Sequence, residues 1–177
     1  MNAAARGFTL IELMIGLTIM ALLLLAAAPF TQAWVDGTRQ MRARSNLVEA
    51  VSQARSLAMR NPHAVDLAQS GKGVAAVVYN KAEYELCVVS RKADGSAWNL
   101  CSDADWRGKI ANPASLKLHS DDAEEPADFA CAAFDSRGLL VKDATYAGSS
   151  CMNPSSGTAS EVRIRVGNQE VMRVALL

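Results

Sequence analysis

The chain has 177 residues, 50% of them apolar, and its 18 basic side chains are balanced by 18 acidic ones. This length suits one compact domain with appended elements, and it is sufficient for a substantial buried core. Formal neutrality argues against a protein whose whole surface attracts nucleic-acid phosphates, but it leaves local basic patches open.

The first predicted element is an apolar segment at residues 8–28, in which Glu12 is the only charged residue. As a helix at ~1.5 Å per residue it would be about 31 Å long, close to the thickness of a bilayer core. A cleaved secretory signal is disfavoured, because Pro29 directly follows the small residues that cleavage would need. A plain anchor leaves the carboxylate unexplained, since a charge at the bilayer centre costs roughly 2.5–3.5 kcal/mol.

The stretch "RGFTLIELMIGLTIMALLLLAAAP" accounts for this carboxylate, because it resembles the type III signal of type IV prepilins and of type II secretion pseudopilins. The resemblance implies a leader peptide of residues 1–7, a cut between Gly7 and Phe8 by a prepilin peptidase, and methylation of the Phe8 amine. It also implies that Glu12 pairs with the amine of a neighbouring subunit while apolar helices pack into a helical filament. The expected partners are therefore the peptidase, the inner membrane, and other major and minor pilins.

Two indications of membrane orientation conflict. Arg39, Arg42 and Arg44 follow the apolar segment, whereas only Arg6 precedes it, so the positive-inside rule places the rest of the chain in the cytoplasm. The leader and the four cysteines instead require an exported, oxidising compartment. We expect a single-pass inner-membrane protein with its C-terminal domain in the periplasm, from which it is assembled into a pilus at the cell surface. The excess of arginines on the exported side remains a conflict.

Residues 29–61 are predicted to continue the helix, with one apolar stripe that packs on a globular domain. The members of this stripe recur at steps of three and four residues: Leu47, Val48, Val51, Ala54, Leu57 and Ala58. Pro29 removes one helical hydrogen bond, so a kink or local melting is expected there, and Gly37 weakens the helix again. Asn61, which precedes Pro62, is the expected end of the helix.

Residues 62–177 are predicted to form a globular antiparallel β domain, because the apolar period changes to two from Val65 onward. One hairpin is expected in "VAAVVYNKAEYELCVVS", with its turn from Asn80 to Glu83, and a second turn signal lies at residues 93–96. Further strands are expected in "SLKLH", "CAAFDSRGLLV" and "EVRIRVGNQEVMRVALL", the last of which has a turn at Gly167-Asn168 and a return strand from Glu170 to Leu176. The predicted fold class is α+β: a long N-terminal helix, half transmembrane and half amphipathic, packed on a small two-sheet sandwich.

The four cysteines allow three disulfide connectivities. A two-residue turn centred on Asp94-Gly95 would place residue 102 opposite Cys87, and a bulge or a slightly longer loop would bring Cys101 there instead. Facing strand residues approach closely enough for a disulfide after modest adjustment. The expected pairs are therefore Cys87–Cys101, with Cys131–Cys151 left to tie the "CAAF" strand to the serine-rich loop.

Two further stretches, "ARSLAMRNPHAV" and "FDSRGLLV", resemble the FimT/FimU and GspH branch of minor pilins. Some FimT-like proteins bind DNA during natural transformation through an arginine-bearing motif near the C-terminus. In this chain the corresponding contacts would be Arg163 and Arg165 of "VRIRV", with Arg173 across from them. The glycine–arginine pairing of that motif is absent here and Glu161 lies nearby, so arginines on a solvated outer strand are the simpler interpretation.

No constellation of catalytic or metal-binding residues is evident in the sequence, and we expect neither an enzyme nor a cofactor. His63 and His119 are the only histidines, and each lacks a second ligand at zinc spacing. The leading hypothesis is a minor pilin of a type IV pilus, placed at or near the tip to prime assembly, with a role in adhesion, twitching motility or DNA uptake. The alternatives are a minor pseudopilin of a type II secretion system and a membrane-anchored periplasmic enzyme or binding protein.

Overall fold

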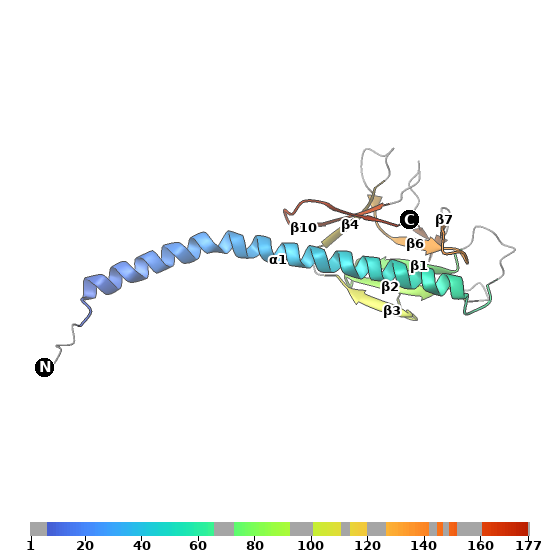
Figure 1. Ribbon diagram of the computed structural model, residues 1–177, viewed down its shortest axis with the longest axis horizontal. Helices are drawn as coiled ribbons and strands as arrows, with labels where there is room; N and C mark the ends of the chain where they lie inside the picture. The colour runs from blue at the N-terminus through green and yellow to red at the C-terminus, as the bar shows by residue number, and fades with distance from the viewer. Residues whose placement is uncertain are drawn as a thin grey trace. The chain divides into compact units, whose positions relative to one another are not determined.

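The computed structural model describes residues 7–65, 73–92, 101–110, 114–119, 127–141, 145–146, 149–151 and 161–176. In these residues one long helix is followed by antiparallel strands, which confirms the predicted α+β class (Figure 1). The elements are α1 (Leu10–Arg60), β1 (Ala75–Asn80), β2 (Glu85–Ser90), β3 (Trp106–Lys109), β4 (Ala114–His119), β5 (Ala127–Asp128), β6 (Cys131–Phe134), β7 (Leu140–Val141), β8 (Thr145–Tyr146), β9 (Ser149–Ser150), β10 (Glu161–Val166) and β11 (Met172–Ala175). The chain divides into two compact units between Val35 and Asp36, inside α1.

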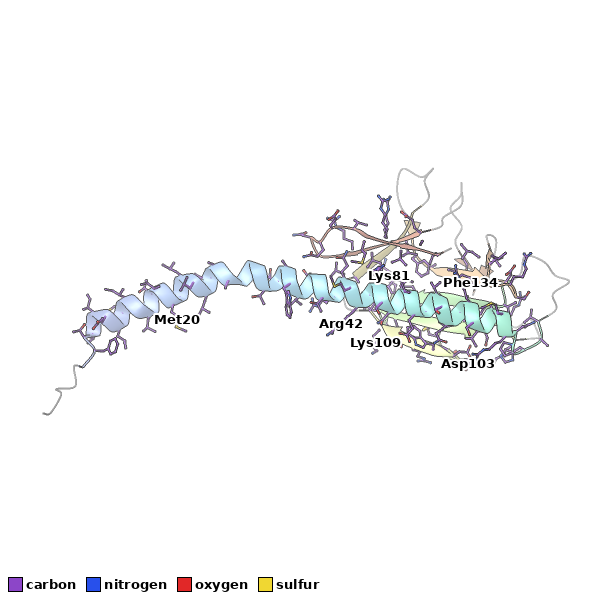
Figure 2. All side chains as sticks on the ribbon, viewed as in Figure 1. Met20, Arg42, Lys81, Asp103, Lys109 and Phe134 are labelled. Atoms are coloured by element: carbon purple, nitrogen blue, oxygen red, sulfur yellow. A yellow bond between two sulfur atoms is a disulfide. The ribbon has the colours of Figure 1, made fainter. Side chains whose placement is uncertain are left out.

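The first unit contains the apolar part of α1. Its large apolar side chains from Leu10 to Leu25, among them Met20, are each more than half exposed and project outward from the helix (Figure 2). By length and composition α1 can cross a membrane. The Thr18 hydroxyl donates to the Met14 carbonyl at 2.7 Å, so this polar group would keep a hydrogen-bond partner inside a bilayer.

Proline and glycine do not interrupt α1. The helix runs through Pro29 and Gly37 without a break, so the local melting expected at Pro29 is wrong. The helix tolerates Pro29 because proline removes a single backbone donor while the neighbouring turns keep theirs. A kink at Pro29 stays a prediction.

The helix ends where the sequence predicts. Asn61 has a positive φ of 44°, the left-handed conformation that closes many helices, and its N–H donates to the Leu57 carbonyl at 3.0 Å. Its side-chain amide then bonds the backbone of Val65 twice, accepting from the N–H at 2.8 Å and donating to the carbonyl at 3.0 Å. Asparagine suits this position because its short polar side chain tolerates the left-handed region and satisfies nearby backbone groups.

The strands of the second unit form two main sheets. One sheet has the order β3-β2-β1-β6-β7 and the other the order β11-β10-β4-β5, while β8 and β9 pair separately. The predicted first hairpin is confirmed: β1 pairs with β2 in the register Asn80↔Glu85, and the Asn80 side chain accepts from the backbone N–H of Ala82 at 3.1 Å. The predicted strands at "SLKLH", "CAAF" and "EVRIRV" are also confirmed as β4, β6 and β10.

Two buried clusters explain the different burial patterns of the sheets. The larger cluster combines α1 with both sheets, and it includes Leu47, Val77, Phe134 and Ile164. The smaller cluster covers the other face of the five-stranded sheet with Val78, Val89, Cys131, Val141 and Cys151. Because β1 is covered on both faces, four consecutive residues are buried, whereas β10 alternates buried with more exposed residues.

The apolar stripe of α1 differs from the predicted one at its margin. Val48 is 48% exposed and does not belong to the core, whereas Ala43 and Ala50 are fully buried. The small size of alanine explains why Ala43 and Ala50 were not predicted and why they are buried. Alanine contributes little to a hydrophobicity pattern, yet it lets a helix approach a sheet closely. The centre of the buried face therefore lies along Ala43, Leu47 and Ala50 rather than along Val48.

Polar contacts fix α1 to both sheets. Gln40, which is 5% exposed, donates through Nε2 to the carbonyl of Ile164 at 2.9 Å and to that of Glu170 at 2.6 Å. Asn46 donates to the Lys109 carbonyl at 2.8 Å, at the outer edge of β3. Each bond satisfies a backbone carbonyl, so the helix is aligned by directional contacts as well as by apolar burial.

Candidate assembly site

The N-terminus of α1 is closed by a reciprocal capping box. Thr9 precedes the helix, and its hydroxyl oxygen accepts from the Glu12 N–H at 3.3 Å. Glu12 Oε2 in turn accepts from the Thr9 N–H at 3.3 Å and from the Thr9 hydroxyl at 3.2 Å. In this arrangement two backbone donors without helical partners are satisfied, and a carboxylate lies at the positive end of the helix dipole.

The predicted processing site lies directly before this cap. Phe8 is 85% exposed, and among the described residues other than its chain neighbours no atom lies within 4 Å of the position that a Cβ on Gly7 would occupy. The Phe8 side of the predicted cut is therefore exposed. A new amine at Phe8 would lie one residue before Thr9, and Glu12 is the acidic residue of the first helical turn.

The carboxylate of Glu12 can bind a cation in addition to its own helix. A carboxylate accepts about four hydrogen bonds, and the two donors of Thr9 share Oε2. Because the surrounding apolar side chains are exposed, lipid or other apolar helices must cover them. In such a low-dielectric environment an amine brought by a second helix would pair strongly with this carboxylate.

Both predicted disulfides are present in the structure. Cys87 is bonded to Cys101 and Cys131 to Cys151, with Cα–Cα distances of 5.5 and 4.6 Å. The predicted register behind the first pair is wrong, because the residue opposite Cys87 is Arg107 of β3. Cys101 lies in the turn before β3 with a φ of 49°, so a longer connection than the expected tight hairpin leads from β2 to its partner strand.

No thiolate is available for a metal at the one candidate cluster found among the described residues. The Glu85 carboxylate and the sulfurs of Cys87 and Cys101 lie within 4.8 Å of one another. Both sulfurs belong to the disulfide, and zinc binds thiolates rather than disulfide sulfur. His63 is in the turn after α1, and His119 is the last residue of β4.

The C-terminal arginines lie on one face of the second sheet. Arg163 of β10 is directly opposite Arg173 of β11, as predicted, and Arg165 follows Arg163 at the spacing that keeps both on one face. Glu161, the first residue of β10, contacts both arginines: its Oε1 is 3.5 Å from Arg163 Nε and 3.8 Å from Arg173 Nη1. The sequence places Glu161 near these arginines, and the ion-pair distances show that its carboxylate pairs with both Arg163 and Arg173.

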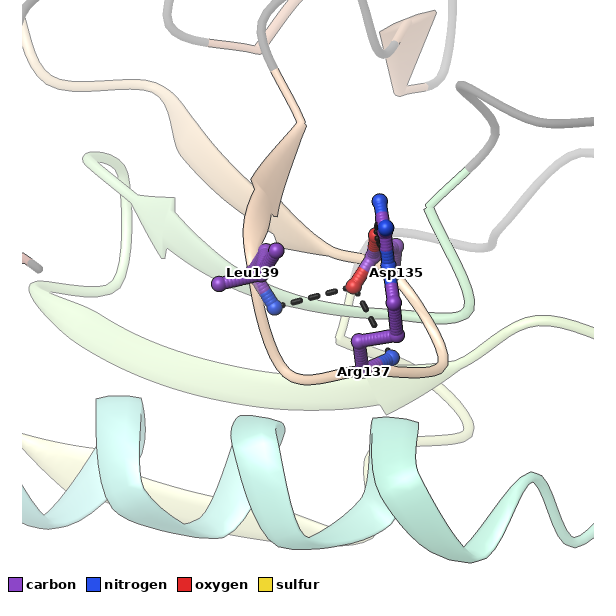
Figure 3. A network of polar contacts seen from close by, with 3 residues as sticks. All are labelled: Asp135, Arg137 and Leu139. Atoms are coloured by element: carbon purple, nitrogen blue, oxygen red, sulfur yellow. Dashed lines mark hydrogen bonds and ion pairs between the residues drawn. The ribbon is translucent and has the colours of Figure 1, made fainter.

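A compact turn joins β6 to β7 in the segment "FDSRGLLV" (Figure 3). Asp135 Oδ1 accepts from the N–H groups of Arg137 and Leu139, each at 2.9 Å, while Oδ2 accepts from the Arg137 guanidinium at 2.9 and 3.0 Å. Burial by itself would raise the pKa of Asp135, but these hydrogen bonds hold that pKa below its ordinary value. Gly138 has a φ of +75°, which favours glycine, and a Cβ there would lie 3.5 Å from Met59 Cγ.

Comparison with known proteins supports the processing site. Residues 2–28 match the family model for the prokaryotic N-terminal methylation motif. No curated protein and no solved structure matches the chain significantly. The matched motif supports a type IV pilin-like or pseudopilin-like protein that is processed by a prepilin peptidase and assembles with other pilins. The apolar helix of the first unit fits membrane anchoring before such assembly.

Proposed function

We propose that the chain is a minor pilin of a type IV pilus, incorporated at or near the tip to prime assembly. The observation that carries this proposal is the methylation motif together with Glu12 at the capped N-terminus of an apolar helix. An apolar helix whose side chains are exposed on all sides is stable only in lipid or among other such helices. A filament supplies the second environment, and the carboxylate supplies a contact that orients each new subunit.

The globular unit supports an exported, structural role. Two disulfides form and persist in oxidising compartments, so we place this unit in the periplasm before assembly. The proposed role is non-enzymatic: the unit presents a surface on the fibre, where adhesion, twitching motility or DNA uptake would use it. A minor pseudopilin of a type II secretion system has the same signal and is the alternative function.

N-terminal mass spectrometry tests the processing step. The mature chain is expected to begin at Phe8 and to carry one additional methyl group on its amine, whereas cells without the peptidase should retain Met1. A chain that keeps Met1 in peptidase-competent cells, or that is cut after Ala28, would exclude the pilin proposal and favour a membrane-anchored enzyme or binding protein.

Deletion of the chain distinguishes the two filament systems. A pilus component should be recovered from sheared surface fibres, and its loss should reduce piliation while protein secretion continues. A secretion pseudopilin should give the opposite pair of results. The discriminating measurement is therefore made on the same deletion strain, with fibre yield and secreted protein quantified in parallel and restored by the parent chain.

DNA binding is a second candidate function, favoured by one observation in the structure. Arg163 and Arg173 face each other across β10 and β11, and Lys117 of β4 occupies the next place in the same row. A row of basic residues across three strands suits a phosphate backbone. The ion pairs with Glu161 weaken this proposal, because phosphate would have to compete for both arginines.

A further inference from the structure

Three arginines lie on α1 directly after the membrane-anchoring unit. Arg42 and Arg44 are exposed, and Arg42 can be located on the helix in Figure 2. The side chain of Arg39 is 43% exposed and forms an ion pair with Asp36 at 3.5 Å. Between Asp36 and Arg44 the sequence therefore contains three positive charges and one negative charge.

Some basic residues of the second unit are paired with an acidic side chain, and others, Arg42 and Arg44 among them, form no ion pair with a described residue. Arg39, Lys81, Lys92, Arg137, Arg163 and Arg173 each form an ion pair with an aspartate or glutamate. Among the residues that the structure describes, none forms an ion pair with Arg42 or Arg44. The two arginines flank the buried Ala43 on the helix, so each guanidinium group is separately available for an anion from outside the chain.

The length of chain between the membrane and these arginines is short. Trp34 is 74% exposed, and an exposed indole after an apolar span is typical of the headgroup level of a bilayer. Arg42 follows eight residues later, so at ~1.5 Å per residue it lies at most about 12 Å farther along the helix. A bend would only shorten this distance. Side chains on a helix point toward its N-terminus and arginine is long, so each guanidinium can lie several ångström closer to the headgroups than its Cα. This brings the charge to about one Debye length, ~8 Å at physiological ionic strength, from the headgroups.

We propose that Arg42 and Arg44 bind the phosphate groups of anionic phospholipids while the chain is held in the membrane. A guanidinium matches phosphate geometry with two parallel hydrogen bonds, and the apolar helix keeps the arginines at a high effective concentration near the surface. The contact orients the globular unit on the leaflet that it faces, before incorporation into a filament. It also gives a physical role to the arginines that conflict with the positive-inside rule.

Arginine footprinting of the full chain in lipid nanodiscs tests this proposal. Phenylglyoxal modification is followed by mass spectrometry in discs of phosphatidylcholine alone and in discs containing phosphatidylglycerol. Arg42 and Arg44 are expected to react about fivefold more slowly in the anionic discs, the factor typical of one basic side chain near an anionic surface. Arg60 and Arg137, which are exposed and lie farther along the chain, serve as internal controls and should react equally in both.

Salt distinguishes lipid binding from burial by protein. At about 1 M salt the Debye length falls to about 3 Å, so the slower reaction should return to the rate in neutral discs. Equal rates of Arg42 and Arg44 in both discs, an equal slowing of the control arginines, or a slowing that salt does not reverse would each overturn the proposal. The proposal rests on membrane anchoring alone, so its failure would leave the methylated N-terminus and the pilin assignment untouched.

Discussion

Substitution of Glu12 separates its capping role from its charge. Glu12→Gln keeps a side-chain oxygen that can accept from Thr9 but removes the negative charge, whereas Glu12→Ala removes both. Loss of a cap costs about 1 kcal/mol of helix stability. Removal of a carboxylate from the apolar segment makes insertion more favourable, by at most roughly 2.5–3.5 kcal/mol. Both variants should therefore insert in the membrane as well as the parent chain.

Recruitment into filaments should depend on the negative charge of Glu12. If Glu12 pairs with the amine of a neighbouring subunit among apolar helices, removal of one partner of that buried ion pair costs about 3–5 kcal/mol. The lower value corresponds to a decrease of about 150-fold in the equilibrium constant for incorporation, because each ~1.4 kcal/mol changes an equilibrium constant tenfold.

The assay compares the amount of each variant in sheared filaments with the amount inserted in the membrane. Glu12→Gln and Glu12→Ala should both fall to background, and Glu12→Asp should recover part of the signal because it restores the charge on a shorter side chain. Thr9→Ser, which keeps the hydroxyl, is the matched control for the cap. Normal incorporation of Glu12→Gln would show that hydrogen bonding, rather than charge, is what assembly requires.

Three further predictions concern the globular unit. Replacing Cys131 and Cys151 with alanine should destabilise it by about 3 kcal/mol, a decrease in Tm of about 10 °C by calorimetry of the full chain in detergent, because the bond closes a 20-residue separation; a change below about 1 kcal/mol would contradict this account of the disulfide. The pKa of Asp135 is lower in the folded chain than its ordinary value of 3.8, so its contribution to stability is present above pH 4 and is lost as the pH falls through the folded pKa. In urea unfolding, the free energy of unfolding should fall less between pH 7 and pH 3 for Asp135→Asn than for the parent chain. An equal fall in both chains would exclude this role of Asp135. If the arginine row binds DNA, the chain should bind duplex with a steep dependence on salt, and Arg163→Gln with Arg173→Gln should weaken binding to all sequences alike; no binding at low salt would exclude DNA as a ligand.

Local signals predicted the helix end and two of the hairpins. Asn61 before Pro62 acts through backbone geometry that a few neighbouring residues determine, so the end of α1 could be located from sequence. The same holds for the turn after Asn80 and for the turn at Gly167, where φ is +55°. Pairing of Cys87 with Cys101 was predicted correctly although the strand register was not, because a disulfide tolerates several local geometries.

Features that depend on tertiary packing could not be predicted. β3 has the sequence "WRGK", which contains a glycine and has no clear alternation, and it was missed. The reason for its stability is visible in the fold: the Trp106 ring covers Gly108, where a Cβ would clash with the ring, and the indole N–H donates to Glu49 of α1 at 3.2 Å. The capping box, by contrast, is local: Thr9 and Glu12 have the spacing of this motif, but a lone carboxylate in an apolar segment equally indicates an intermolecular partner.

The unbroken helix has a mechanical consequence for a subunit that is pulled out of a bilayer. Force applied to the apolar segment would be transmitted along α1, and Gln40 is the first buried side chain after Phe30 in the helix. The two bonds from Gln40 to the carbonyls of Ile164 and Glu170 would carry this load into the β10–β11 hairpin before the apolar core is strained. Tension during extraction is therefore expected to strain the β10–β11 hairpin first.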